Sequence, residues 1–452
     1  MSSRDRLAES LAAVVGEQNV IADPDLRASY EQDATGRYRG SARLVVSPSD
    51  GAGCAAVLVA CARAGVPVVP QGGNTGLVGA GVPREGEVVL STRRMSALEE
   101  IDEVAGQMIA GAGVVLADAQ VAATRVGREL TIDHGARSAA TLGGMAATDA
   151  GGAMALRYGT MRSHVVGLEA VLADGRTVSR MSGLIKDNAG YRWPDLLVGS
   201  EGTLAVITRL RVRLGELPPR RLSALFGATS FEHALGLLRS LLEKAPSLRA
   251  ADFFTAEGLE LVCRHRDLRP PLSAERPIYL IVECAGRGDL LEELAAVDPE
   301  GHGEVVVADD TLGQARLWEY RDAQNEAIRA NGVPHKLDVS VPLTRIASFA
   351  EDLRALLDAE RPTARLVLYG HLGDGNLHVN VLGLDPDDSE ADEAVLRLAV
   401  GHGGTISAEH GVGIAKARWL DLVRSEEEIA LMRSIKTAFD PGGVLSPGRV
   451  LT

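Results

Sequence analysis

The stretch PQGGNTGLVG, residues 70–79, ends a compact strand–helix–strand pattern. In that pattern we expect strands at residues 43–46 and 66–69, and a helix whose apolar body is residues 55–62. Glycine allows a backbone to approach a ligand closely, and successive N–H groups of a glycine-rich loop can bind an anion such as a diphosphate. We call residues 70–79 the first glycine loop.

A second glycine-rich stretch, GGMAATDAGG, covers residues 143–152. One such stretch alone would most simply be an ordinary tight turn. Two of them, together with Glu201-Gly202 before an expected strand, favour an extended dinucleotide whose diphosphate is held by backbone amides. Neither stretch contains the Gly-Lys-Ser/Thr of a nucleotide-hydrolysing loop, and neither has the GxGxxG pattern of a Rossmann NAD site.

The length and the charge of the chain limit the number of domains and the kinds of partner that it can bind. With 452 residues it has room for two or three domains, and a formal net charge of -14 argues against nucleic acid or an anionic membrane as a partner. The four cysteines include no CxxC pair, which is typical of a reduced compartment. No apolar core of a signal peptide and no stretch of about 20 apolar residues is present, so we expect a cytoplasmic protein that reaches any membrane acceptor by peripheral docking.

Pro218-Pro219 marks a change in the pattern of the chain. Residues 1–214 carry both glycine stretches and are expected to form a cofactor-binding domain. Helices and strands then alternate over residues 215–415, which indicates an α+β domain with an antiparallel sheet. Residues 416–452 are expected to form a C-terminal segment.

The strongest local signal is YGHLGDGNLHVN, residues 369–380, which reads as two strands joined by a turn. If residues 373–376 form the turn, His371 lies directly opposite His378 on the same face, so the two imidazoles can bind one metal ion. Asn380 lies on that face too, because strand side chains alternate.

A further carboxylate and a further imidazole stand side by side in SAEHGVG, residues 407–413. Glu409 is a candidate third metal ligand, and two histidines with one carboxylate suit Zn²⁺, Mn²⁺ or Fe²⁺. His410 points away from Glu409 and is a candidate general base. Arg321 and Lys336 are candidate cations for an acidic substrate, although spacing alone supports them weakly.

At these residues the chain resembles the FAD-linked 2-hydroxy acid dehydrogenases of the vanillyl-alcohol oxidase type. The first glycine loop, residues 369–380 and residues 407–413 resemble most the D-2-hydroxyglutarate members, whereas RYGTM, residues 157–161, is shared with the D-lactate members. The resemblance extends from about residue 20 to the end of the chain. It implies an α+β protein with a PCMH-type FAD-binding domain, a substrate (cap) domain with an antiparallel sheet, and a C-terminal segment that returns to the FAD domain.

The resemblance also implies the roles of individual residues. It implies a metal ion at His371, His378 and Glu409, zinc ahead of manganese or iron, with His410 as the catalytic base. FAD is expected to be non-covalent, because no histidine occupies the first glycine loop. The implied substrate contacts are Arg321, Asn325, Lys336 and Asn380. The implied FAD contacts are Pro70, Gln71, Gly72, Gly73, Asn74, Thr75, Gly76, Leu77, Gly135, Ala136, Thr141, Gly144, Ala147, Thr148, Gly151, Glu201, Gly202 and Ile207.

Some positions depart from the family pattern. Asn325 stands where the hydroxyglutarate enzymes usually carry threonine, Asp149 stands where asparagine is common, and Ser446-Pro447 replaces the usual Asn-Pro. The difference at Asn325 bears on the substrate, because that residue is an implied substrate contact. Because most of the shared motifs resemble the D-2-hydroxyglutarate members, D-2-hydroxyglutarate is still expected ahead of D-lactate, glycolate or D-malate.

The expected reaction is hydride transfer from the substrate to flavin N5, which gives a 2-oxo acid. The electron acceptor is expected to be an electron-transfer flavoprotein, a quinone or a cytochrome rather than NAD, and both reaction with O₂ and a homodimer stay open. Two other classes of protein share some of these features. A flavin-free metal-dependent hydrolase would need no glycine stretches and would be colourless, and a flavin-containing sensor would not be bleached by a 2-hydroxy acid.

Overall fold

The computed structural model describes residues 3–84, 86–298 and 304–452 and divides them between two compact units. Unit 1 contains residues up to Gly151, Thr160–Leu217 and Glu409–Thr452. Unit 2 contains Gly152–Gly159 and Pro218–Ala408. The boundary at Leu217 falls next to the double proline, and the transfer of Gly152–Gly159 to unit 2 has no counterpart in the sequence pattern.

The first part of unit 1 is a small sheet with strand order β1-β2-β4-β3. β2, β4 and β3 run parallel to one another, whereas β1 pairs with β2 antiparallel. Helices α1 and α3 contribute Leu11, Val57 and Leu58 to the apolar core beneath this sheet. The elements are β1 (Val20–Ile21), β2 (Ala42–Val46), β3 (Val68–Gln71), β4 (Glu87–Ser91), α1 (Ser3–Val15), α2 (Pro24–Arg27) and α3 (Gly51–Arg63).

The second part of unit 1 is an antiparallel sheet with strand order β5-β6-β10-β8-β9. Its core includes Met108, Leu116 and Met145 from β6, α4 and α5. The elements are β5 (Leu98–Asp102), β6 (Gln107–Gly111), β8 (Val165–Val171), β9 (Thr177–Arg180), β10 (Val206–Arg213), α4 (Leu116–Arg125), α5 (Leu142–Thr148), α7 (Met161–His164), α8 (Pro194–Leu197) and α16 (Glu426–Phe439), with β7 (Arg128–Glu129) and β11 (Gly215–Glu216) forming a separate pair.

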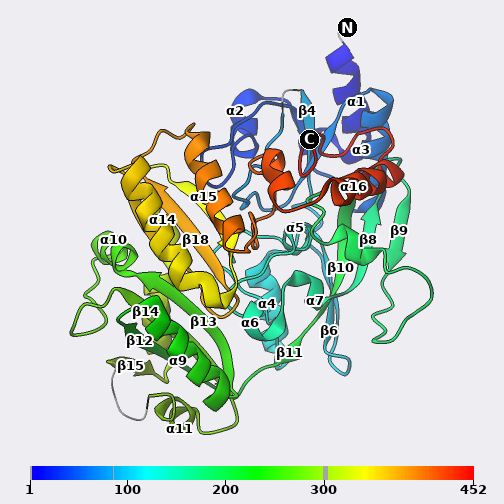
Figure 1. The fold of residues 1–452 in the computed structure, drawn as a ribbon. Coiled ribbons are helices and arrows are strands. Elements are labelled where there is room, and N and C mark those ends of the chain that lie inside the picture. The colour runs from blue at the N-terminus through cyan, green and yellow to red at the C-terminus, as the bar shows by residue number, and fades with distance from the viewer. Residues whose placement is uncertain (1–2, 85, 299–303) are drawn as a thin grey trace. The chain divides into compact units, whose positions relative to one another are not determined.

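Unit 2 is built on a seven-stranded sheet with strand order β15-β12-β14-β13-β17-β18-β16, in which every neighbouring pair is antiparallel (Figure 1). Helices α10, α12 and α13 pack on the face that carries Phe254, Val367 and Tyr369. The strands are β12 (Arg220–Ala228), β13 (Leu248–Thr255), β14 (Ile278–Gly286), β15 (Val305–Ala308), β16 (His335–Ser340), β17 (Arg365–His371) and β18 (Asn376–Leu382).

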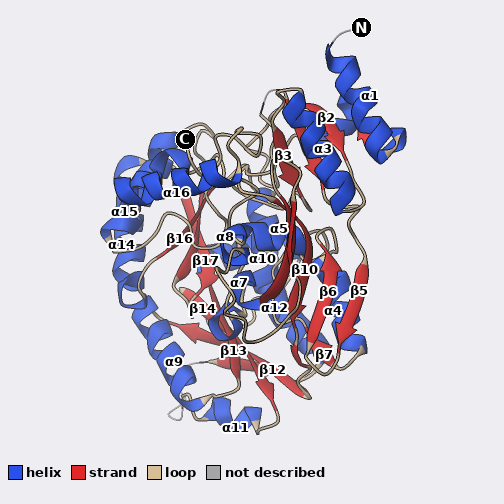
Figure 2. Cartoon of the chain, turned by 90° about the vertical axis from the view of Figure 1, so that its right-hand side faces the viewer, coloured by secondary structure: helices blue, strands red, loops and turns tan. Residues whose placement is uncertain are grey.

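Figure 2 shows helices and strands of both units by colour, with the long helices α9 and α14 of unit 2 along the sheet strands. Phe231 of α9 packs edge-on against Phe253 of β13, on the face opposite Phe254. The helices of unit 2 are α6 (Ala155–Tyr158), α9 (Phe231–Lys244), α10 (Ala256–Arg266), α11 (Leu290–Ala295), α12 (Thr311–Asp322), α13 (Gln324–Arg329), α14 (Ile346–Glu360) and α15 (Ser389–Gly401).

One sequence expectation about local structure is wrong. The second glycine stretch was expected to be a loop, but residues 142–148 form helix α5. Thr141 caps this helix by accepting a hydrogen bond from Gly144 N, and Gly143 is required because an added Cβ atom would lie 2.5 Å from the Cβ of Ala112. The low helix propensity of glycine is therefore overridden by close packing. In the described part of the chain, no helix is long and apolar enough to span a bilayer.

Candidate functional site

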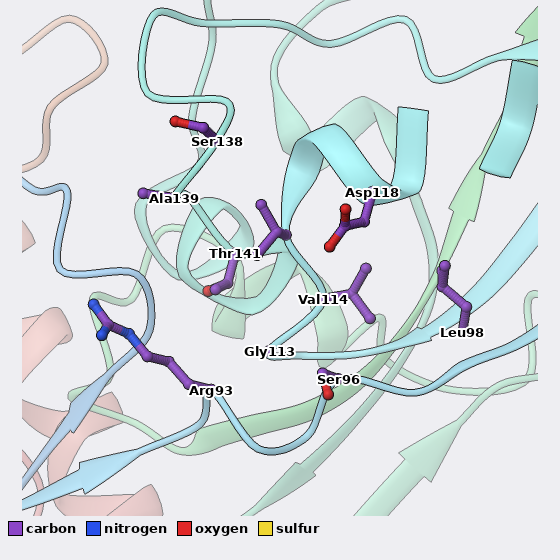
Figure 3. A pocket seen from close by; sticks show the side chains of 10 residues that line it. Arg93, Ser96, Leu98, Gly113, Val114, Asp118, Ser138, Ala139 and Thr141 are labelled. Atoms are coloured by element: carbon purple, nitrogen blue, oxygen red, sulfur yellow. The ribbon is translucent and has the colours of Figure 1, made fainter. Parts of the chain in front are cut away.

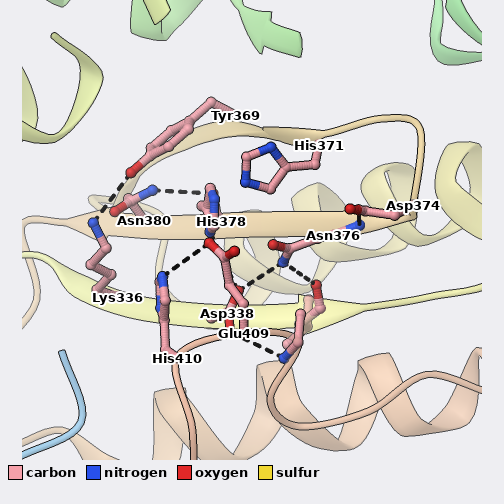
Figure 4. Close-up of polar contacts among 12 residues, drawn as sticks. Lys336, Asp338, Tyr369, His371, Asp374, Asn376, His378, Asn380, Glu409 and His410 are labelled. Atoms are coloured by element: carbon pink, nitrogen blue, oxygen red, sulfur yellow. Dashed lines mark hydrogen bonds and ion pairs between the residues drawn. The ribbon is translucent and has the colours of Figure 1, made fainter. Parts of the chain in front are cut away.

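The hairpin of β17 and β18 carries both predicted metal-binding histidines, but its register differs from the prediction. His371 is paired with Asn376, and His378 is paired with Tyr369. The turn uses residues 372–375, because Asn376 is already part of β18 and its side-chain nitrogen donates to Asp338. The pairing is shifted by two residues, which keeps side chains on the same face. The two rings therefore still lie together, with centroids 5.3 Å apart (Figure 4).

His371 is held by Asp252, a residue that the sequence analysis did not single out. Asp252 lies on β13 and is the cross-strand partner of His371. Its Oδ1 atom is 2.7 Å from Nδ1 of His371, so Nε2 is the nitrogen with which this imidazole would bind a metal. Burial would raise the pKa of Asp252, but the neighbouring charges of His371 and Arg321 outweigh it, and the pKa is lowered. Asp252 is therefore an anion in the interior of unit 2.

Arg321 lies in the last turn of α12 and reaches the same carboxylate. Its Nε atom forms an ion pair with Oδ2 of Asp252 at 2.8 Å. Its guanidinium carbon lies 4.7 Å from the centre of the Tyr369 ring, within the range of a cation–π contact. The first of the two predicted substrate cations is thus fixed on the face of the sheet that carries Tyr369.

Lys336 on β16 is the second predicted cation, and it belongs to a network with Tyr369 and Asn325. Lys336 Nζ donates to the Tyr369 hydroxyl at 3.2 Å and to Asn325 Oδ1, and Figure 4 shows Lys336 and Tyr369 pointing toward each other. The Tyr369 hydroxyl donates to Asn325 Oδ1 at 2.6 Å. The structure therefore brings Arg321, Asn325 and Lys336 together around one tyrosine ring.

Asn380 is fully buried on the same face, opposite Lys336. Its side-chain nitrogen donates to the main-chain oxygen of His378 at 3.1 Å. Its Oδ1 atom is buried and has no hydrogen-bond partner among the described residues. A buried acceptor without a donor is costly, so this atom is suited to a ligand that carries a hydroxyl group.

His378 faces a second buried carboxylate, that of Asp338 on the neighbouring strand β16. The distance from His378 Nδ1 to Asp338 Oδ1 is 3.4 Å. Asp338 also accepts from Asn376 at 2.7 Å and from the backbone N–H of Ala408 at 3.0 Å. Asp338 was missed in the sequence, although its spacing from Lys336 on a strand places both on one face.

Glu409 and His410 are the first residues of the last segment of unit 1. They follow directly after Ala408, whose N–H is bonded to Asp338. Within this segment, His410 Nε2 lies 3.6 Å from Glu409 Oε1. Another histidine of unit 1, His134, lies near both of them, and burial lowers its pKa. His134 belongs to no recognisable motif, although it stands directly before the predicted flavin contacts Gly135 and Ala136.

Glu201, one of the predicted flavin contacts, binds the backbone of the loop that follows His410. Its two carboxylate oxygens accept from the N–H groups of Val412 and Gly413 at 2.7 and 2.8 Å. Burial raises the pKa of Glu201 above its usual value, against the lowering effect of these bonds and of Lys416. The side chain therefore holds the loop that follows His410.

The two glycine stretches of unit 1 lie against each other. A Cβ atom added to Gly72 would be 2.4 Å from Thr141 Oγ1, and one added to Gly73 would be 2.0 Å from the oxygen of Ala139. Part of the glycine content is thus explained by close packing of the protein itself. The arrangement nevertheless brings the predicted flavin contacts of residues 70–77 and 141–148 side by side.

The first glycine loop also presents backbone donors. Arg93 donates to the oxygens of Gly72 and Gly73, at 3.1 and 2.8 Å. Because N–H and C=O point in opposite directions in a trans peptide, the N–H groups of Gly73 and Asn74 point away from Arg93. In the described part of the chain, no hydrogen bond has the N–H groups of residues 73–76 as donors. Such a row of unused donors fits the diphosphate of a dinucleotide.

A pocket of about 520 Å³ opens beside this region of unit 1 (Figure 3). Predicted flavin contact Thr141 lies in its wall, as does Arg93. Among the other predicted contacts, Ile207 is buried in β10, and Gln71 and Asn74 use their side chains to bind backbone oxygens of the protein. The pocket is lined by Arg93, Ser96, Leu98, Gly113, Val114, Val115, Asp118, Ser138, Ala139 and Thr141.

Comparison with protein families identifies the class to which this fold belongs. Residues 42–180 match the model of an FAD binding domain, and residues 217–450 match the model described as the C-terminal domain of FAD linked oxidases. The solved structure of p-cresol methylhydroxylase with substrate bound has the same fold, with a TM-score of 0.79, 15% identity, and coverage of 99% of this chain and 96% of that one. These matches confirm the α+β fold with a PCMH-type FAD-binding domain and define an FAD-dependent oxidoreductase, so a flavin-free hydrolase is ruled out.

Three curated relatives specify the family further. D-2-hydroxyglutarate dehydrogenase of Bos taurus is 36% identical over 99% of this chain and 84% of its own. The enzyme of the same name from Arabidopsis thaliana is 32% identical over 97% and 80%, and a putative D-lactate dehydrogenase of Schizosaccharomyces pombe is 34% identical over 94% and 85%. The chain therefore belongs to the family of FAD-linked D-2-hydroxy acid dehydrogenases.

The expected cytoplasmic location is contradicted by the same relatives. The enzymes from Arabidopsis thaliana, Bos taurus and Danio rerio are all named mitochondrial. The sequence argument failed because it considered only a secretory signal and a membrane span, and neither feature bears on delivery to mitochondria.

Proposed function

We propose that the protein oxidises D-2-hydroxyglutarate to 2-oxoglutarate, ahead of D-lactate, glycolate or D-malate. The observation that carries this proposal is the pair of cations beside the Tyr369 ring of unit 2. The Arg321 guanidinium carbon and Lys336 Nζ lie 4.7 and 5.8 Å from the centre of the Tyr369 ring. Two cations suit a substrate with two carboxylates, whereas lactate and glycolate have only one. The names of the curated relatives point in the same direction.

We further propose that His371, His378 and Glu409 hold a divalent metal ion, zinc ahead of manganese or iron. The donor set of two imidazoles and a carboxylate fits such an ion. The Nδ1 atom of His371 is hydrogen-bonded to the buried Asp252, a typical arrangement for a metal-binding histidine, and the Nδ1 atom of His378 lies 3.4 Å from the buried Asp338. Glu409 is covalently next to Ala408, which is bonded to Asp338, so the chain itself keeps this carboxylate near the two strands.

The residues of the chain have separate tasks in the proposed reaction. When bound, FAD supplies the hydride acceptor and the metal ion supplies positive charge that favours loss of the hydroxyl proton. Arg321 and Lys336 bind the carboxylates, and Asn325 contributes its amide beside Lys336. Asn380 Oδ1 accepts from the substrate hydroxyl before reaction. His410 accepts the hydroxyl proton, and the N–H groups of residues 73–76 bind the diphosphate of FAD.

An anaerobic bleaching screen tests the substrate. The purified yellow protein is mixed with D- and L-lactate, glycolate, D-malate and D-2-hydroxyglutarate in the absence of oxygen, and the loss of oxidised-flavin absorbance is followed. We expect the fastest bleaching with D-2-hydroxyglutarate and none with L-lactate. Faster bleaching by D-lactate would assign the enzyme to the monocarboxylate branch, and no bleaching by any of the acids would refute the proposed reaction.

Chelation tests the metal. Removal of the ion should abolish bleaching by the best substrate while the flavin stays bound, and addition of Zn²⁺, Mn²⁺ or Fe²⁺ should restore it. Activity that is indifferent to chelation and to added metal would refute the metal's role. The same holo-protein can then be offered an electron-transfer flavoprotein, a quinone or a cytochrome as acceptor, and its mass in solution tests whether it forms a homodimer.

A further inference from the structure

Two aspartates and two histidines form a row across four adjacent strands of unit 2. Asp252 on β13 is the register partner of His371 on β17, and Asp338 on β16 is the register partner of His378 on β18. The strands follow one another in the order β13-β17-β18-β16. The two carboxylates thus lie at the outer ends of the row and the two imidazoles lie between them.

Asp252 differs from Asp338 in what its second oxygen binds. Oδ1 of Asp252 bonds His371, whereas Oδ2 forms the ion pair with Arg321. The second oxygen of Asp338 instead accepts from a backbone N–H group. One fully buried carboxylate therefore joins a proposed metal ligand to a proposed substrate-binding cation. A buried charge is costly unless it is paired, and here both partners belong to the candidate site.

We propose that Asp252 is a positioning residue that couples the metal-binding imidazole of His371 to the substrate-binding guanidinium of Arg321. This inference rests on the proposed function, because it assigns Asp252 to the same site. The carboxylate fixes the Nδ1–H tautomer of His371, so that Nε2 ligates the metal. It also fixes the Nε side of Arg321, so that the outer nitrogens of the guanidinium are presented to the substrate. Loss of His371 or of Arg321 then disturbs the position of the other residue.

The first test is Asp252→Asn, which keeps the size of the side chain but removes its charge. One amide atom still accepts from His371, whereas the other turns N–H donors toward Arg321. We expect the metal dissociation constant, measured by chelator competition without substrate, to rise about 10–100-fold. We also expect KM for the hydroxy acid to rise about tenfold or more, because Arg321 is no longer held.

Asp392→Asn is the matched control. Asp392 is buried and bonds Nδ1 of His335 at 2.7 Å, the same distance as in the Asp252–His371 pair, but it lies on α15 away from the row. We expect this variant to lose thermal stability while its metal affinity and KM stay unchanged. Equal metal affinity and equal KM in Asp252→Asn and the wild-type protein would overturn the inference.

A second pair of variants keeps the inference testable if Asp252→Asn does not fold. Arg321→Met and Lys336→Met each remove one cation of the candidate site, and only Arg321 touches Asp252. Removing a nearby positive charge should by itself strengthen the binding of a metal ion. A loss of metal affinity in Arg321→Met would therefore come from the broken contact between Arg321 and Asp252. We expect weaker metal binding in Arg321→Met than in Lys336→Met. Equal affinities in the two variants would refute the coupling.

The outcomes also separate this inference from the proposed function. A wild-type protein that binds no metal would refute the metal site, and with it both statements. A wild-type protein that binds metal and is bleached by a hydroxy acid, with variants at position 252 that bind metal equally well, would refute only the role of Asp252.

Discussion

His410 is the residue on which the proposed proton transfer depends. It stands next to Glu409 in a loop whose following backbone N–H groups are held by Glu201. A loop held in this way can present one imidazole in a fixed direction. The proposed general base therefore has a position that is set by hydrogen bonds of its loop rather than by a helix or strand.

Replacement of His410 by alanine should reduce turnover with the best substrate by about 10²–10⁴-fold, because a positioned general base contributes that much. Flavin content should not change. His402→Ala is a suitable control, because His402 bonds Asp352 at 2.9 Å, outside the candidate site. Stopped-flow reduction of the flavin measures the effect, and a variant that reduces its flavin at the wild-type rate would exclude His410 as the base.

Glu201 gives a prediction about pH. Its pKa is raised in the folded protein, so the stability that it contributes is present below its unfolded pKa of about 4.3 and is lost as pH rises through the folded pKa. Glu201→Gln removes this dependence of stability on pH. It also lowers stability at every pH, because the amide cannot accept from the N–H groups of both Val412 and Gly413. The Tm of the variant should therefore approach that of the wild type as pH is raised from about 4. A constant difference in Tm across this range would contradict the raised pKa.

At the scale of elements, the turn between β17 and β18 sets the register of the histidines. Gly375 has a φ of +80°, and a Cβ atom added there would lie 2.4 Å from the oxygen of Val341. The sequence correctly indicated a turn around residues 373–376 and the face shared by His371 and His378. It placed the register two residues away, because the side-chain bonds of Asn376 that extend β18 are tertiary contacts.

Gly375→Ala should destabilise unit 2 by more than about 2 kcal/mol, because the left-handed conformation costs an L-residue about 1–2 kcal/mol and the contact with Val341 adds to it. Gly403→Ala is the control, since Gly403 has a φ of +78° but only an ordinary contact at 3.8 Å. Thermal unfolding compares the two. A loss no larger than that of Gly403→Ala would show that the turn adapts without strain.

Strand β13 is one of the elements that the sequence pattern did not predict. Its eight residues are all buried, so the apolar and polar alternation that marks a half-exposed strand is missing. Arg249 and Asp252 also interrupt the apolar run by which a fully buried strand is recognised. The same charged residue that hides the strand in the sequence is the one that holds His371 and Arg321. Functional residues on such strands become visible only when neighbouring strands are placed beside them.

At the scale of the whole molecule, the last residues complete unit 1. Arg449 is fully buried and binds both carboxylate oxygens of Glu87 at 2.8 and 2.7 Å, while its Nε atom donates to the oxygen of Ala80. Residues 80–87 follow the first glycine loop. The general fold class was readable from the sequence, because the glycine loops and the hairpin are local signals. The pairing of Arg449 with Glu87 could not be predicted from the sequence, because the two residues are more than 360 positions apart and no local pattern marks them.

Arg449→Met should lower stability by about 3–5 kcal/mol, because it leaves the charge of Glu87 buried without its partner. It should also weaken FAD retention, since the segment after the first glycine loop loses its anchor. The double variant Arg449→Met with Glu87→Gln should recover part of the loss. Thermal unfolding and the flavin-to-protein absorbance ratio after gel filtration provide the measurements, and a single variant as stable as the wild type would contradict the expectation.

The division of unit 1 among three separate stretches of chain has a consequence for how the enzyme matures. The stretch Glu409–Thr452 follows unit 2 in the chain, and it carries Arg449 as well as the loop held by Glu201. A nascent chain that has only emerged as far as unit 2 therefore has an unfinished flavin-binding unit. Stable capture of the cofactor therefore has to wait until Glu409–Thr452 has been synthesised and has packed into unit 1.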